Sequence, residues 1–339
     1  MVTMQERMAL VIATAMCAAS CAAPTAPVRL PAPVPGATSR SASIRIRVQV
    51  REGGALVVRS VPLEEYVAAT IVSEVDPPDA DPGVAERMYE VQAVISRTYV
   101  LAQRGRHERD GFDVCATTHC QLYEPARLRA SKWADAARAA AARTSGDVLW
   151  FANAPARAVF HSDCGGRTSS AAAVWGGAAP AYLAGERDGG PAADAHTEWT
   201  FDVRKPAIRD ALNADARTRI GNMLDHIQVS ARDAAGRAER VTIKGTRTVV
   251  VRGEVLRDAL TRAFGVKSIR STLFTVTRTR EGFAFAGRGF GHGVGLCQAG
   301  AFARLKAGAS PEAVLRFYYP GTRIAHDPPA LQAHNPALP

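Results

Sequence analysis

The sequence lacks several features that define common protein classes. It has no internal repeat, few lysines and, after residue 20, no apolar run long enough to cross a bilayer as a helix. Its formal net charge of +10 comes almost entirely from scattered arginines, and no run alternates basic with aromatic residues. Nucleic acid is therefore not an expected partner, whereas a polyanionic cell-envelope surface would suit the charge. A composition of 47% hydrophobic residues over 339 positions excludes a disordered chain and allows one large domain or two small ones.

The first residues have the pattern of an export signal. Arg7 precedes an apolar stretch over residues 8–19 that is too short to span a membrane. Cys21 follows Ala-Ser, which is similar to a bacterial lipoprotein processing site, and would carry a lipid anchor; cleavage by an ordinary signal peptidase just after it is the alternative. We assign residues 1–22 to the signal and the proline-rich residues 23–42 to a linker, and we expect a protein of the periplasm or cell envelope.

Export would place the four remaining cysteines in an oxidising compartment. Their even number permits two disulfides, or one disulfide together with a metal or thiol site. Cys115, His119 and Cys120 lie within six residues, and His107 is nearby. These side chains could bind Zn²⁺ as a Cys₂His₂ set, although the spacing is not that of a standard zinc finger. A disulfide between Cys115 and Cys120 is the alternative that the compartment favours.

Hydrophobic periodicity predicts a mixed α+β fold. Alternating apolar residues indicate strands over 43–50 and 55–59, and a four-residue spacing indicates helices from Pro62 and over 84–103. The other predicted elements are helices over 131–144, 253–264, 297–306 and from 310, and strands over 148–152, 157–161, 227–231, 241–244, 248–252, 272–277 and 282–285. We therefore expect a helical core with β-rich segments. The predicted domain covers 43–324, with a β-rich portion at about 200–288, and a tail follows over 325–339.

Glu74 has an unusual position in the helix that begins near Pro62. At about 100° per residue, it falls within about 20° of both Leu63 and Val67, on the apolar stripe that should face the core. A buried carboxyl group has a raised pKa, which suits a general acid. The alternative is a side chain that turns to solvent at the frayed end of the helix, before Asp76.

Two polar clusters with glycines follow predicted strands. Residues 289–298 combine four glycines with His292 and Gln298, and such glycines suit positive φ or a close backbone approach. His161 and Ser162 open the second cluster at a strand end, where binding and catalytic residues are commonly presented. A tight corner and a capped turn are the respective alternatives.

Two polar residues lie among apolar neighbours in the helix over 84–103. Gln92 falls on its apolar stripe, and Arg97 is surrounded by small and branched apolar residues. Buried polar side chains must find partners, so both residues belong either to a site or to a structural network.

Several short motifs occur in a fixed order between about residues 44 and 324. They are LEEY at 63–66, SE at 73–74, VQA at 91–93, SRTY at 96–99, TTHCQ at 117–121, HS with GG within 161–166, the glycine-rich run over 287–298 and YYPGT at 318–322. Together they make the sequence resemble the SpoIID/LytB family, named for the stage II sporulation protein D domain. The resemblance implies a SpoIID-type fold and a peptidoglycan lytic transglycosylase. Such an enzyme cleaves the β-1,4 bond between N-acetylmuramic acid and N-acetylglucosamine and leaves a 1,6-anhydro product.

The resemblance also implies roles for particular residues. The family's catalytic glutamate maps onto Glu74, and its zinc-binding residues fall at Cys115, His119 and Cys120, where zinc would be structural. The candidates for contacting the glycan, or for holding the acid in place, are Gln92, Arg97, His161, Ser162, His292 and Gln298.

Many members of the family carry serine where this sequence has Cys164 and Cys297. This paired difference predicts a disulfide that ties the His161 loop to the His292 loop. The expected partners are peptidoglycan glycan strands and a cell-wall amidase. Two other functions fit the same motifs: a non-catalytic glycan-binding enhancer of an amidase, and a zinc hydrolase centred on the Cys–His cluster.

Overall fold

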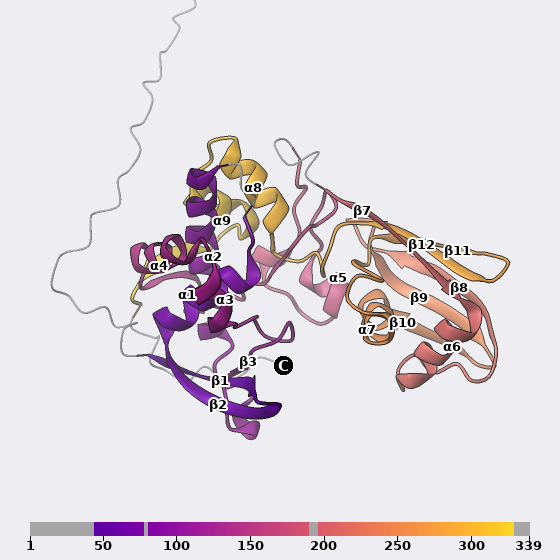
Figure 1. Ribbon diagram of the computed structural model, residues 1–339. Helices are drawn as coiled ribbons and strands as arrows, with labels where there is room; N and C mark the ends of the chain where they lie inside the picture. The colour runs from indigo at the N-terminus through magenta and orange to yellow at the C-terminus, as the bar shows by residue number, and fades with distance from the viewer. Residues whose placement is uncertain (1–43, 78–80, 190–195, 329–339) are drawn as a thin grey trace, which may run out of the picture. The chain divides into compact units, whose positions relative to one another are not determined.

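The computed structural model describes residues 44–77, 81–189 and 196–328 (Figure 1). The predicted signal over 1–22, including Cys21, and the predicted linker over 23–42 lie outside the described residues. Among the helices in the described part of the chain, none combines the length and the apolar character that a membrane crossing requires.

A helical core is built from two parts of the chain that are far apart in sequence. The first part supplies β1 (Arg45–Glu52), β2 (Ala55–Pro62), α1 (Leu63–Glu74), α2 (Pro82–Ala102), β3 (Val114–Cys115), α3 (Pro125–Ala130), α4 (Ala134–Arg143), β4 (Asp147–Phe151), β5 (Ala154–Pro155), β6 (Phe160–His161) and α5 (Ala171–Trp175). The last part supplies β13 (Leu296–Cys297), α8 (Gln298–Lys306), α9 (Pro311–Tyr318) and β14 (Arg323–His326). Both parts contribute to one set of buried apolar side chains. Most residues of α1 and α2 are buried, so these two helices are central to the core.

Strand pairing and helix capping join the two parts. β14 pairs antiparallel with β4, and β13 pairs parallel with β6, so the last segment completes sheets that begin much earlier in the chain. α2 begins where Asp81 Oδ1 accepts the Val84 N–H (3.1 Å). α9 begins where Ser310 Oγ accepts the Ala313 N–H (3.1 Å). In both helices a proline follows the capping residue, where its missing N–H has no cost.

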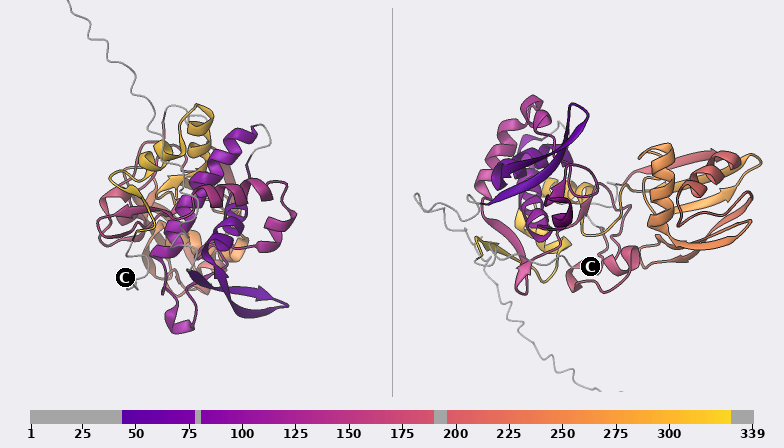
Figure 2. Two further views of the ribbon diagram at one scale, coloured as in Figure 1. Left: turned by 90° about the vertical axis from the view of Figure 1, so that its left-hand side faces the viewer. Right: turned by 90° about the horizontal axis from the view of Figure 1, so that it is seen from below.

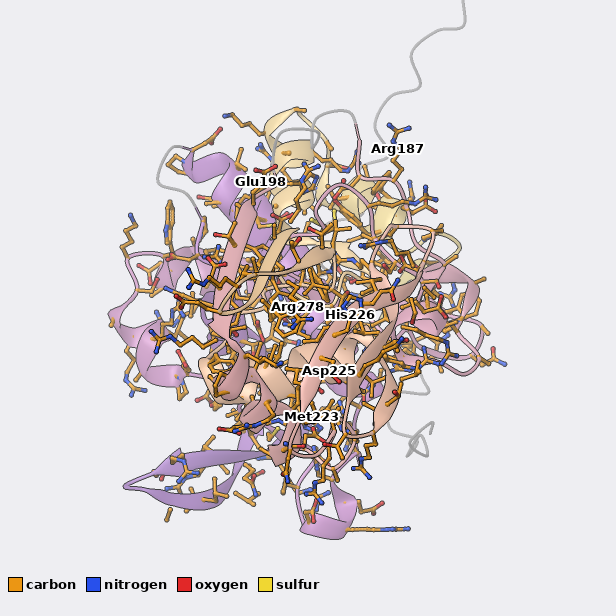
Figure 3. The ribbon with its side chains drawn as sticks, turned by 90° about the vertical axis from the view of Figure 1, so that its right-hand side faces the viewer. Arg187, Glu198, Met223, Asp225, His226 and Arg278 are labelled. Carbon is orange, nitrogen blue, oxygen red and sulfur yellow. The ribbon has the colours of Figure 1, made fainter. Side chains whose placement is uncertain are left out.

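A second core lies between these two parts in sequence. It contains β7 (Glu198–Arg204), α6 (Lys205–Ala214), β8 (Leu224–Arg232), β9 (Ala238–Gly245), β10 (Thr248–Arg252), α7 (Gly253–Phe264), β11 (Phe274–Arg278) and β12 (Gly282–Arg288). The strands form two antiparallel sheets, ordered β10-β9-β8 and β11-β12-β7. The strands are labelled in Figure 1, and Figure 2 shows the same segment from two further sides. Phe274, Phe283 and Phe285 are buried in this core. Met223, Asp225 and His226 are exposed at the start of β8 (Figure 3).

The predicted α+β class is confirmed, but several elements were not predicted. α3 was not predicted because it is too short to show a helical period. β7 and α6 were also not predicted, although their sequences do show periodic patterns: Trp199 and Val203 are buried on the strand, and Ile208 and Leu212 are buried on the helix. The strand predicted over 157–161 is reduced to the two residues of β6, because only these pair with another strand.

Candidate functional site

Glu74 is the last residue of α1, and its carboxyl group is partly buried. Its Oε1 accepts the backbone N–H of Leu122 (2.6 Å). Burial raises the pKa of Glu74 from an ordinary value of 4.5 to about 7, although the Leu122 N–H opposes this rise. The C-terminal end of a helix carries a partial negative charge, which disfavours the carboxylate further. A large fraction of this side chain is therefore protonated at neutral pH, as a general acid requires.

A pair of glutamines holds the backbone at Glu74. Gln298, the first residue of α8, donates from Nε2 to the Glu74 carbonyl oxygen (3.3 Å) and to Gln92 Oε1 (3.2 Å). Gln92 is fully buried and donates to Ser96 Oγ (3.1 Å). The structure thus places both glutamines next to the Glu74 backbone. Because Gln92 is buried, it supports Gln298 and is not accessible to a glycan.

The glycine-rich segment before β13 lies against the end of β6. All four of its alternating glycines have positive φ. A Cβ at Gly295 would lie 2.0 Å from the carbonyl oxygen of Val159, so the two segments approach each other only because this position lacks a side chain. The approach places His292 beside His161, with their ring centroids 5.4 Å apart.

Both imidazoles are neutral at physiological pH. Burial lowers the pKa of His292 to about 3 and the pKa of His161 well below its ordinary value of 6.5, and the cation of Arg237 acts in the same direction on both. His161 donates from Nδ1 to the Val294 carbonyl oxygen (3.1 Å), which leaves its buried Nε2 without a partner. A neutral imidazole with a free ring nitrogen can accept a hydrogen bond from a hydroxyl group.

An exposed aromatic residue that the sequence analysis missed lies beside His292. The ring centroid of Trp175, at the end of α5, is 5.1 Å from that of His292, and the indole is 38% exposed. The guanidinium of Arg157 lies over the same indole, 5.5 Å from its centroid. An exposed ring flanked by polar groups can pack against the apolar face of a sugar. No local signal points to Trp175 or Arg157, because only tertiary packing brings them to the imidazoles.

Replacement of Gly295 by alanine tests whether the close approach to β6 holds this segment in place. Gly308 provides a matched control, because it also has positive φ (+94°) but has open space around its Cα. We expect Gly308→Ala to cost about 1–2 kcal/mol of unfolding free energy from backbone strain alone. We expect Gly295→Ala to cost about 1–3 kcal/mol more, because the Val159 carbonyl must move. Equal losses in urea denaturation of the two variants would contradict this account.

Arg97 and Ser162 have different surroundings from each other. The Arg97 side chain is fully buried and donates to the Glu64 carboxylate (2.9 Å) and to the carbonyl oxygens of Ala141 and Asp147 (3.2 Å each). The prediction that Arg97 contacts the glycan is therefore corrected. A buried guanidinium group needs several hydrogen-bond acceptors, and the acceptors of Arg97 link α2 to α1, α4 and β4. Ser162 is exposed and stays available to a ligand.

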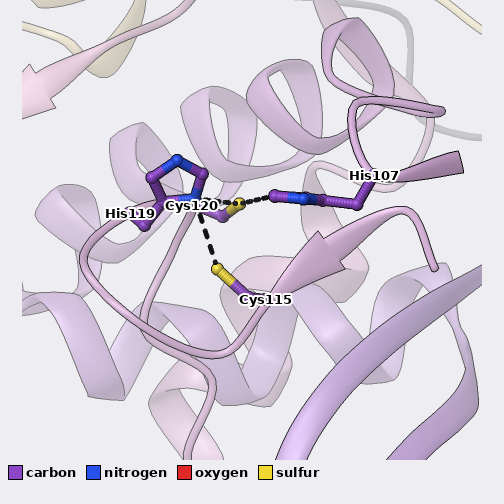
Figure 4. Close-up of side chains that lie close together, drawn as sticks. All are labelled: His107, Cys115, His119 and Cys120. Atoms are coloured by element: carbon purple, nitrogen blue, oxygen red, sulfur yellow. Dashed lines mark hydrogen bonds between the residues drawn. The ribbon is translucent and has the colours of Figure 1, made fainter. Parts of the chain in front are cut away.

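His107, Cys115, His119 and Cys120 form a compact cluster (Figure 4). His119 Nδ1 lies 3.6 Å from each sulfur, and His107 Nε2 lies 3.4 Å from Cys120 Sγ. Two ligands of one tetrahedral Zn²⁺ are about 3.5 Å apart when the metal–sulfur distance is about 2.3 Å and the metal–nitrogen distance about 2.0 Å. Both cysteines are free thiols, so the alternative of a disulfide between them is not what the structure contains. The donor set and its spacing fit zinc.

The predicted disulfide between Cys164 and Cys297 is likewise absent, because both are free thiols. The two residues are nevertheless neighbours: the Cys164 N–H donates to Cys297 Sγ (3.2 Å). Cys297 caps α8 by accepting the Gly300 N–H (3.4 Å), and Cys164 Sγ donates to Asp188 Oδ2 (3.3 Å). The sulfurs therefore have other partners, and the prediction was wrong about the bond between them.

These observations define an α+β protein with a raised-pKa carboxyl group, a supporting glutamine pair and two neutral imidazoles, one at the end of β6 and one on the glycine-rich segment before β13. Residues 51–151 match the model of the SpoIID family, described as stage II sporulation protein, and residues 188–295 match a domain of unknown function, DUF8618. The match to the SpoIID family covers the part of the chain that contains Glu74 and the cluster of His107, Cys115, His119 and Cys120.

Similar proteins from two bacilli match this chain over about three quarters of their length. It is 28% identical over 284 residues to stage II sporulation protein D of Bacillus subtilis (strain 168), covering 79% of this chain and 76% of that protein. The corresponding protein of Bacillus amyloliquefaciens is 28% identical over 283 residues. The amidase enhancer of Bacillus subtilis (strain 168) is 25% identical over 276 residues, which are 69% of this chain but only 37% of that protein.

Proposed function

We propose that this protein is a peptidoglycan lytic transglycosylase and that Glu74 is its catalytic acid and base. The observation that carries the proposal is a buried carboxyl group with a pKa of about 7 that accepts the Leu122 N–H, on a residue whose backbone carbonyl oxygen is held by Gln298. The match of residues 51–151 to the SpoIID family, and the similarity to a stage II sporulation protein and to an amidase enhancer, supports a role at the cell wall. Export and a lipid anchor at Cys21 are further predictions from the sequence.

The proposed reaction needs only one titrating group. Glu74, in its protonated form, donates its proton to the glycosidic oxygen, which leaves on the N-acetylglucosamine side as a hydroxyl group. The C6 hydroxyl oxygen of the muramic sugar attacks C1, and the Glu74 carboxylate takes the proton from that hydroxyl. The acid is thereby regenerated, and the product carries a 1,6-anhydro ring. Glycosidases that use water need a second carboxylate, whereas here the substrate supplies the nucleophile.

The side chains around His292 suit the hydroxyl groups and ring faces of a sugar. Neutral His161 keeps one ring nitrogen without a partner, whereas His292 accepts the Val294 N–H at Nδ1 and stays uncharged. Trp175 offers an apolar face, and exposed Ser162 offers a hydroxyl group. We therefore assign glycan contact to Trp175 and Ser162, the support of Trp175 to His292 with His161 beside it, and the support of Glu74 to Gln92 and Gln298.

We also propose that His107, Cys115, His119 and Cys120 bind a structural Zn²⁺. Four protein ligands would fill a tetrahedral site and leave no position for a substrate, which distinguishes a structural from a catalytic zinc. The cluster is followed directly by Gln121, whose Oε1 accepts the Tyr66 hydroxyl (3.0 Å), and by Leu122, which bonds to Glu74. The metal would thus fix the loop that positions the acid.

A non-catalytic enhancer of an amidase is the second candidate function, and the similarity to the amidase enhancer favours it. The two functions differ in whether glycan strands are cut. The decisive experiment is mass spectrometry of purified glycan strands after incubation with the wild-type protein. We expect anhydro-terminated fragments; their absence, with glycan binding retained, would favour the enhancer.

The raised pKa also predicts how Glu74 affects stability. Because the folded-state pKa (about 7) exceeds the unfolded value (4.5), the stability contribution of the protonated side chain is complete below 4.5 and is lost as pH rises through about 7. We expect Glu74→Gln to match the wild type near about pH 4 and to be more stable by up to about 3 kcal/mol near about pH 9. Urea denaturation across this range measures the difference. A Glu74→Gln protein that is less stable than the wild type at high pH would show that the Glu74 carboxylate does not destabilise the fold.

A further inference from the structure

We propose that Cys164, Cys297 and His196 bind a second metal ion of the zinc type, with Asp188 as the fourth ligand. This site is separate from the cluster around Cys120 and does not depend on the proposed function. One ligand atom from each of Asp163, Cys164, His196 and Cys297 lies within 4.8 Å of the others, and all but His196 are buried. The His196 imidazole itself is also inaccessible to solvent.

Backbone N–H groups surround both sulfurs. Cys297 Sγ accepts from the Cys164 N–H (3.2 Å) and the Gly300 N–H (3.4 Å), and Cys164 Sγ accepts from the Gly166 N–H (3.3 Å). A neutral thiol is a weak acceptor, whereas a thiolate is the form that binds a metal and accepts such bonds well. Three N–H donors on two sulfurs are therefore an arrangement that suits metal-bound thiolates.

His196 has the orientation expected of a metal ligand. Its Nδ1 lies 2.6 Å from Asp163 Oδ1, and its buried Nε2 has no hydrogen-bond partner. Histidines that bind metals commonly donate one ring N–H to a carboxylate and use the other nitrogen as the ligand. Asp163 is thus the supporting carboxylate, because two such ligands on one tetrahedral ion would be about 3.3 Å apart. Its other oxygen is already bonded to the N–H and hydroxyl of Thr197.

We assign the fourth position to Asp188 because of its contact with Cys164. Its Oδ2 lies 3.3 Å from Cys164 Sγ, close to the separation of about 3.5 Å that sulfur and oxygen ligands of one zinc ion would have. The carboxylate is buried and is held by the Tyr318 hydroxyl (2.8 Å) and the Arg304 guanidinium (2.9 Å). Binding would convert two thiols to thiolates and release two protons for each metal ion.

The proposed metal would fasten three separate segments at one point. Cys164 follows β6, His196 precedes β7, and Cys297 caps α8 directly before Gln298. The ion would therefore link the entry to the β-rich core with the two loops that carry His161 and His292. Its role would be structural, because four protein ligands leave no open position.

Metal counting on the full protein tests the proposal. The protein is purified with zinc in the medium, dialysed, and analysed by elemental mass spectrometry. We expect two zinc ions per chain in the wild type and one in each of two paired variants, Cys164→Ser with Cys297→Ser and Cys115→Ser with Cys120→Ser. A single zinc ion in the wild type, lost entirely in the Cys115/Cys120 pair, would overturn the second site.

Alkylation of the wild-type protein avoids reliance on a variant that fails to fold. Native protein is treated with iodoacetamide with and without a chelator, and the modified cysteines are identified by peptide mapping. We expect Cys164 and Cys297 to react after chelation and to regain protection only when two equivalents of zinc, and not one, are returned to the chelated protein. Protection that one equivalent restores in full, or resistance that ends only on reduction of a disulfide, would overturn the proposal.

Discussion

Replacement of Glu74 by glutamine is expected to lower the formation of anhydro-terminated glycan fragments by about 10²- to 10⁴-fold, the range over which general acid–base catalysis acts. Glutamine retains the size of the side chain and an oxygen that can accept the Leu122 N–H, but it cannot donate a proton to the leaving oxygen. The variant should therefore keep its fold and its affinity for glycan strands, measured by co-sedimentation, and lose only the cutting reaction.

Glu65→Gln is the matched control for this experiment. Glu65 lies at the start of the same helix, is exposed to solvent, and should tolerate the same change with full activity. A Glu74→Gln protein that still produced anhydro ends at the wild-type rate would exclude Glu74 as the acid. If neither the wild type nor the variant cut glycan but both bound it, the enhancer function would replace the enzymatic one.

The same residue sets the expected pH dependence. Because the acid must be protonated in the free enzyme, kcat/KM should be constant well below pH 7 and should fall about tenfold per pH unit above the pKa of about 7. His161 and His292 remain neutral over this range, since burial lowers both of their pKa values. A profile with its descending limb near 4.5 would show that Glu74 is not desolvated in solution.

Removal of metal from the cluster of His107, Cys115, His119 and Cys120 is expected to have the second large effect. Zinc binding in small structural sites contributes on the order of 10 kcal/mol at neutral pH, and that energy is available only to the folded state. We expect Cys120→Ser, or chelation, to lower the melting temperature strongly and to abolish activity together with it. The reason for the joint loss is that the loop ends at Leu122, the hydrogen-bond donor to Glu74.

Thr118→Ala serves as the control, because Thr118 is an exposed residue of the same loop. Calorimetry and glycan digestion, run before and after addition of zinc to the chelated protein, distinguish the two roles of a metal. Recovery of both properties together supports a structural ion. Loss of turnover with no change in melting, combined with an active Glu74→Gln protein, would instead indicate a zinc hydrolase.

The sequence pattern predicts that Glu74 is buried, but for an incomplete reason. The helical wheel places Glu74 on one apolar stripe of α1. Most residues of this helix are buried on every side, however, so a residue near its C-terminal end would be buried at almost any angle on the wheel. The four glycines of the loop before β13 were informative for a better reason, since each has the positive φ that alternation suggested.

Other parts of the site could not be obtained from local patterns. Trp175 meets His292, and Arg157 meets Trp175, only through tertiary packing. Arg97 gives the same sequence signal whether it binds a ligand or a structural network. The neighbouring Cys164 and Cys297 illustrate a further limit, because sequence alone does not distinguish a disulfide from two thiols or a metal site.

The helical core draws its strands and helices from both sides of the β-rich insertion, and this has a consequence for biosynthesis. Gln298, which supports the acid, follows the insertion, so an emerging chain that has α1 and α2 but not α8 lacks the support for its acid. Contacts of such long sequence separation form late, because distant segments must first be brought together. A half-made chain would thus carry Glu74 without the means to use it, and cutting activity would arise only after synthesis has passed α8.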